Sequence, residues 1–117
     1  MPAPTLNALK EALALHEILR SLGYPAKDIY LSVFSNGLGI TLLHEGKEMA
    51  FRASDPGEDI PEGEALVTAW NEALEWWNVT ATKEEMDKLF LGSRSRQDVT
   101  LLIATLETNG FHPGELN

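Results

Sequence analysis

The sequence predicts an α+β fold: a helix, a three-stranded antiparallel meander and then three helices, packed as a single domain over residues 1–117. Apolar residues recur at helical spacing near the start and throughout the second half, and they alternate in the stretch between. The connections between the alternating segments are too short for a crossover, which favours antiparallel neighbours. A chain of 117 residues can bury one core but not two.

Residues 6–22 are expected to form the first helix. Thr5 can act as its N-cap. Gly23 and Pro25 predict its end, because glycine adopts the left-handed conformation readily and proline cannot continue a helix.

The apolar arc of this helix is wider than one packing partner requires. It is made by Leu6, Leu9, Leu13, Leu15, Leu19 and Leu22. Two explanations stay open. Either the helix is sandwiched inside the fold, or the part of the arc around Leu6, Leu9 and Leu13 seals a homodimer.

Three strands are expected at residues 29–34, 38–43 and 47–53, where β-branched and aromatic residues are frequent or apolar residues alternate. The pair Asn36-Gly37 favours a type I′ hairpin turn between the first two strands. Glu45-Gly46 supplies the second turn.

Residues 54–63 are expected to be a loop, since they hold two prolines, two glycines and four acids. The next helix has an apolar face at helical spacing, made by Leu66, Trp70, Ala73, Leu74 and Trp77. Glu64, Thr68, Glu72 and Glu75 point the other way. Trp76 is expected at the rim of the apolar face.

Two short helices complete the predicted fold. Thr82 and Glu85 form a capping box that opens the first, which ends at Gly92 and turns Met86, Leu89 and Phe90 inward. Ser95 opens the second, whose apolar stripe is Val99, Leu102, Ile103 and Leu106. Residues 1–5 and 112–117 are expected to be frayed.

The charge is unevenly distributed. Eighteen acids and nine bases give a net charge of −9, but residues 1–53 are neutral, and residues 54–78 hold seven acids with no lysine or arginine. This acidic stretch either keeps the protein soluble or binds a protein partner, and its charge permits a basic one. In the second case we expect Glu64, Glu72 and Glu75 to make the binding face and Trp76 to anchor it.

Residue types needed for several kinds of chemistry are missing. There is no cysteine, which excludes disulfides and thiolate nucleophiles. His16, His44 and His112 lack the spacing that places two metal ligands on one helix face, so neither a metal nor another cofactor is expected. We therefore expect a small acidic protein–protein interaction module without catalytic chemistry. The alternatives are a nucleic-acid-mimic inhibitor of a basic partner and a small enzyme whose site residues meet only in space.

The order of elements over residues 6–78 is similar to that of a double-stranded-RNA-binding domain. That family contacts phosphates through a lysine-rich start of its last helix, whereas residues 61–64 here are Pro-Glu-Gly-Glu. Residues 83–111 resemble the latter part of a winged helix-turn-helix, in which only Arg94 and Arg96 could touch DNA. The other interpretation of this segment is a plain helical hairpin packed on the sheet. Direct nucleic-acid binding is not expected.

No apolar run approaches the roughly 20 residues that cross a bilayer. The first residues lack the basic and apolar regions of a signal peptide. We therefore expect a soluble cytoplasmic protein that does not bind membranes.

Overall fold

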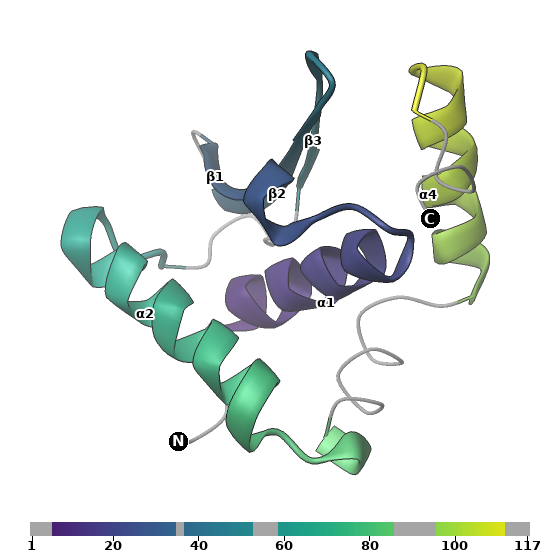
Figure 1. Cartoon of the computed structure of the whole chain (residues 1–117). Coiled ribbons are helices and arrows are strands. Elements are labelled where there is room, and N and C mark those ends of the chain that lie inside the picture. Colours follow the sequence, from purple (N-terminus) through teal and green to yellow (C-terminus); the bar gives the residue numbers. More distant parts are fainter. Residues whose placement is uncertain (1–5, 35–36, 53–58, 86–95, 112–117) are drawn as a thin grey trace.

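A computed structural model describes residues 6–34, 37–52, 59–85 and 96–111. It confirms the predicted α+β class and the order of its elements (Figure 1). The elements are α1 (Asn7–Ser21), a 3-10 turn η1 (Ala26–Asp28), β1 (Ile29–Phe34), β2 (Gly37–His44), β3 (Lys47–Arg52), α2 (Gly63–Glu75), a π-helical turn η2 (Trp76–Thr80) and α4 (Arg96–Thr108).

The sheet has the order β1-β2-β3, with both neighbouring pairs antiparallel, as the short connections predict. The turn between β2 and β3 contains only Glu45 and Gly46, whose φ angles of 51° and 79° are both positive, as a type I′ turn requires. The predicted Asn36-Gly37 turn lies partly outside the described residues. The central strand turns Leu38, Ile40 and Leu42 into the core, where all three are fully buried.

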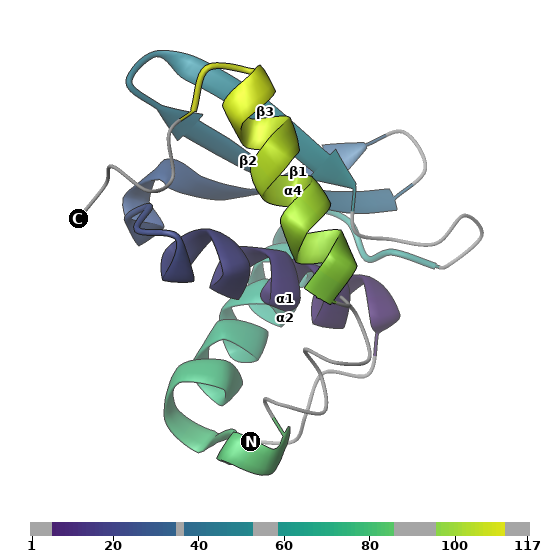
Figure 2. The same cartoon turned by 90° about the vertical axis from the view of Figure 1, so that its right-hand side faces the viewer.

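Helix α1 lies between the sheet and α2 (Figures 1 and 2). The predicted N-cap was wrong, because Leu6 occupies that position and caps the helix without a side-chain hydrogen bond. The predicted end is confirmed: Gly23 has a φ of 106°, and Tyr24 N–H donates to the Leu19 carbonyl oxygen in a Schellman motif.

The structure contains the sandwiched arrangement that the wide apolar arc of α1 allowed. Leu9 is buried in a cluster with Leu38 of β2 and Leu66 of α2. Leu13 is buried in another cluster with Trp76 and Trp77. The chain's own residues therefore cover two of the three leucines that were candidates for a dimer interface, and the third, Leu6, packs partly buried against the first cluster.

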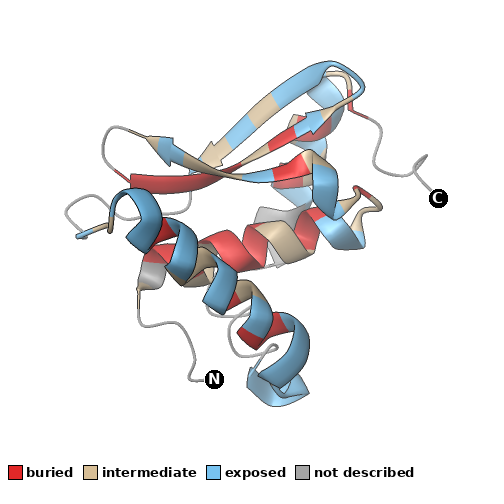
Figure 3. Cartoon of the chain, turned by 60° about the vertical axis from the view of Figure 1, so that its left-hand side comes forward, coloured by how far each residue is buried: buried red, intermediate tan, exposed pale blue. Residues whose placement is uncertain are grey.

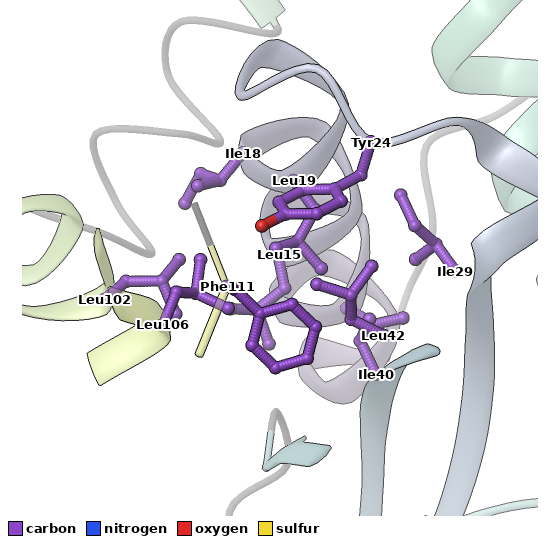
Figure 4. Close-up of a cluster of buried hydrophobic side chains, with 11 residues drawn as sticks. Leu15, Ile18, Leu19, Tyr24, Ile29, Ile40, Leu42, Leu102, Leu106 and Phe111 are labelled. Carbon is purple, nitrogen blue, oxygen red and sulfur yellow. The ribbon is translucent and has the colours of Figure 1, made fainter. Parts of the chain in front are cut away.

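Helix α4 closes the remaining side of the core. Its Leu102 and Leu106 are buried, as the apolar stripe predicts, and they pack with residues of α1 and β2 (Figure 4). The helix ends in a second Schellman motif, in which Gly110 has a φ of 87° and Phe111 N–H donates to the Leu106 carbonyl oxygen.

The capping box formed by Thr82 and Glu85 is confirmed. Thr82 N–H donates to Glu85 Oε1 over 3.2 Å, and Glu85 N–H donates to Thr82 Oγ1 over 3.1 Å. The rest of the predicted short helix, the turn at 92–96 and the Ser95 cap lie at least partly outside the described residues. Within the described parts of the chain, no helix combines the length and the apolar character that crossing a bilayer demands.

Candidate interaction site

Aromatic residues of α2 and of the following turn η2 hold this part of the chain against α1. Trp77 Nε1 donates to Glu17 Oε2 over 3.2 Å. The rings of Trp70 and His16 meet edge to face with their centroids 6.1 Å apart. Burial lowers the pKa of His16; the carboxylate of Glu17 opposes this shift and the guanidinium of Arg20 adds to it. These contacts fix which side of α2 faces away from the protein.

The expected position of Trp76 at the rim of α2 was wrong, because the residue is only 4% exposed. Regular helical spacing ends at this residue, where the π-helical turn begins. Ala81 N–H donates to the Trp76 carbonyl oxygen over 2.5 Å and closes this turn. Ala81 packs against the cluster that contains Trp76. Trp76 therefore lacks the exposed surface on which its proposed role as an anchor rests.

The outward side of α2 carries the predicted acids. Glu64, Glu72 and Glu75 are all exposed, and Thr68 and Asn71 are exposed with them. Figure 3 shows this side as a nearly continuous exposed strip, while the buried residues of α2 face α1. We call this strip, with the neighbouring Val67, the acidic face.

Val67 was not singled out from the sequence, and it is 57% exposed. Its position about 100° around the helix from buried Leu66 was the signal that could have identified it. An exposed valine beside several carboxylates offers the apolar contact that Trp76 does not.

The acidic face is electrostatically unfavourable for the isolated helix. Glu72 and Glu75 are three residues apart, so their like charges lie near each other. The last turn of α2, which η2 continues directly, contains no lysine or arginine beside them. Among the described residues, no lysine, arginine or histidine forms an ion pair with Glu64, Glu72 or Glu75.

A second polar cluster joins η1 to the end of β2. His44 Nδ1 lies 2.8 Å from Asp28 Oδ2 and, since a carboxylate can only accept, carries the shared hydrogen. The ring of Tyr24 packs edge to face against His44 with centroids 5.1 Å apart. The Tyr24 hydroxyl is buried and has no hydrogen-bond partner among the described residues, and burial, with the nearby Glu45 carboxylate, raises the pKa of Tyr24.

This cluster ties the turn after α1 to the sheet, with Asp28 2.8 Å from one ring nitrogen of His44 and Glu45 3.7 Å from the other. In the described residues, no three histidines, aspartates or glutamates gather closely enough to hold a metal ion. His16 and His44 belong to different clusters, and His112 lies outside the described residues.

Comparison of the chain with protein-family models, with curated proteins and with solved structures found no match. The function is therefore inferred from the geometry of the protein's own residues.

Proposed function

We propose that this protein is an interaction module whose acidic face binds a basic protein partner. The acids that take part are Glu64, Glu72 and Glu75. The observation that supports the proposal most is the pair Glu72 and Glu75 in the last turn of α2, near one another and without a cation.

This arrangement stabilises a complex rather than the free protein. Repulsion between like charges on neighbouring turns costs about 0.2–0.5 kcal/mol. A lysine or arginine from a partner would relieve this repulsion. Solubility alone explains the net charge, but it does not require two acids at this spacing without a cation beside them.

Charge by itself gives little affinity, because exposed ion pairs contribute only about 0–1 kcal/mol each. The partner must also cover apolar surface. We assign this contact to Val67, which lies at the edge of the acidic face and is 57% exposed.

A photo-cross-linking experiment can identify the partner. Because the chain has no cysteine, a Val67→Cys variant can carry a single benzophenone label on the acidic face. Leu43→Cys, which is exposed on the sheet, is the matched control. We expect position 67, but not position 43, to cross-link to a basic protein in an extract of the source cells.

Calorimetry with the purified partner then tests the mechanism. We expect Glu64→Gln, Glu72→Gln and Glu75→Gln each to weaken binding by about two- to fivefold, and the affinity to fall as salt rises. Glu107→Gln, which removes an exposed acid from α4, should leave the affinity unchanged. An affinity that changes neither with salt nor with the three α2 substitutions would contradict the proposal.

The same complex shows whether the acidic face mimics a nucleic acid or is an ordinary protein-docking surface. If the partner is a nucleic-acid-binding protein and duplex DNA or RNA competes with the acidic face, the protein is a nucleic-acid mimic. If the partner binds both at once, the acidic face is an ordinary docking surface.

A further inference from the structure

A groove of about 410 Å³ runs between β3 and α4. One wall consists of four consecutive residues of β3, Met49 to Arg52, and the other consists of Leu101, Leu102 and Thr105 of α4. Leu15 of α1 also lines it. The volume is in the range of ligand sites in proteins, and most of the lining is apolar.

The strand in this wall is an edge of the sheet. In the described residues β3 pairs with β2 alone, so the backbone groups on its other side have no strand partner. Met49 and Phe51 are paired with Leu42 and Ile40 and share their inward face, while Ala50 and Arg52 alternate to the opposite face. The groove thus follows the unpaired edge of an extended chain.

The two ends of the groove differ. At the start of β3, Lys47 Nζ donates to the Gly110 carbonyl oxygen over 2.5 Å and fastens the end of α4 to the sheet. At the other end Leu101 is 65% exposed, although it is a leucine that lines an apolar groove. Figure 2 shows α4 passing alongside the sheet next to β3.

Arg52 is the one cation among the described residues that line this groove. Its guanidinium lies 5.5 Å from the centre of the Phe34 ring, and no described acid forms an ion pair with it. In a chain of net charge −9, an arginine without an acidic partner beside an apolar groove is complementary to a ligand with an apolar body and a negative charge.

We propose that this groove binds an extended peptide, which adds to β3 as a fourth strand and places an acidic residue near Arg52. The backbone of the peptide pairs with the free edge of β3. Its alternate apolar side chains enter the groove and cover Leu101 and Met49. This site is separate from the acidic face of α2 and selects a partner of the opposite charge.

The test begins with random octapeptides displayed on phage and selected on the full-length protein. We expect the selected peptides to alternate apolar and polar residues, to lack proline in the central positions and to carry an aspartate or glutamate. Calorimetry then measures the affinity of one synthetic peptide for the protein and its variants.

Leu101→Lys should weaken binding of this peptide by about tenfold or more, because it places a charge in the apolar wall. Arg52→Gln should weaken it by about two- to fivefold, and the loss should disappear when the acidic residue of the peptide is replaced by its amide. Val79→Lys is the matched control, since Val79 is 76% exposed and lies on η2 outside the groove. Circular dichroism should show that all three variants fold.

The extended pairing has its own signature. Methylating the peptide's backbone nitrogens one at a time should weaken binding at every second position, because alternate N–H groups face β3. Three results would overturn the proposal: no peptide is enriched, binding is insensitive to Leu101→Lys, or the methylation profile lacks a period of two. Each is distinguishable from failure of the acidic face, which is measured with different variants.

Discussion

Tyr24 and Phe111 occupy the same position in two Schellman motifs, one at the end of α1 and one at the end of α4, and their rings meet edge to face with centroids 6.2 Å apart. In each motif a glycine in the left-handed conformation precedes the aromatic residue. The glycine turns the chain back so that the next side chain enters the core. Two helix ends that are distant in sequence are thus fastened to each other through one aromatic pair.

The first prediction concerns the buried Tyr24 hydroxyl, for which the described part of the chain offers no hydrogen-bond partner. Tyr24→Phe keeps the ring and removes the uncompensated polar group, so it should raise the free energy of unfolding by about 1 kcal/mol. Phe111→Ala, which removes the other ring, should lower it by about 3–5 kcal/mol. Urea unfolding followed by circular dichroism measures both, and destabilisation by Tyr24→Phe would show that the hydroxyl has a partner.

The second prediction concerns the acidic face. Glu75→Gln removes a negative charge that lies three residues from Glu72 on the same helix. It should therefore stabilise the free protein by about 0.2–0.5 kcal/mol while it weakens partner binding. The measurement is the thermal midpoint at low salt, with Glu107→Gln as the control. A lower midpoint would mean that Glu75 has a stabilising role within the protein.

The third prediction concerns the turn between β2 and β3. Glu45 has a φ of 51°, which costs a residue with a side chain about 1 kcal/mol. Glu45→Asn creates the Asn-Gly pair that this turn favours, so the variant should unfold at a higher urea concentration. Glu48→Asn, at an exposed strand position, is the control and should not stabilise. An unchanged midpoint for Glu45→Asn would contradict the strain argument.

The fourth prediction concerns pH. Because burial lowers the pKa of His16 below its ordinary value of 6.5, the unfolded chain takes up a proton at a higher pH than the folded protein does. The stability that depends on neutral His16 is present above pH 6.5 and is lost as the pH falls from there toward the folded-state pKa, by at most about 1.4 kcal/mol per pH unit. His16→Gln should reduce the loss of stability per pH unit in thermal melts between pH 7 and pH 5. If this pH dependence is unaltered in the variant, other titratable groups cause it.

The fifth prediction concerns the homodimer that the leucines of α1 suggested. Since Leu9 and Leu13 are covered within the chain, Leu13→Ala should cost about 2–5 kcal/mol of stability, and Leu9→Glu should unfold the protein. Neither is expected to yield a folded monomer from a dimer. Light scattering at high micromolar concentration tests this. If the wild-type protein is a dimer and Leu9→Glu is a folded monomer, the leucines of α1 form a dimer interface after all.

Local signals in the sequence predicted most of the fold correctly. The end of α1 follows from Gly23, and the capping box follows from Thr82 and Glu85, since each depends on a few neighbouring residues. The strands agree with their predicted ranges to within one residue over the described positions. Alternation and turn residues are read directly along the chain, which is why these elements could be located.

Features that depend on tertiary contacts could not be predicted in the same way. The leucines of α1 showed how much surface must be covered but not what covers it, so the sandwiched and dimeric arrangements looked alike. Trp76 was misplaced because its burial depends on Leu13 of α1 and on Ala81, which pack against it in the folded protein. The groove beside β3 depends on the distance at which α4 packs, and no residue spacing encodes that distance.

All three tryptophans of the chain lie in α2 and η2. Trp76 and Trp77 belong to a cluster with Leu13 of α1, whereas Trp70 also packs against the cluster that holds Leu102 and Leu106 of α4. Separation of α4 from the core would therefore change the fluorescence of Trp70 alone, whereas separation of α2 from α1 would shift the emission of all three toward longer wavelengths. A comparison of emission with far-ultraviolet circular dichroism can thus reveal whether the two sides of the molecule unfold together.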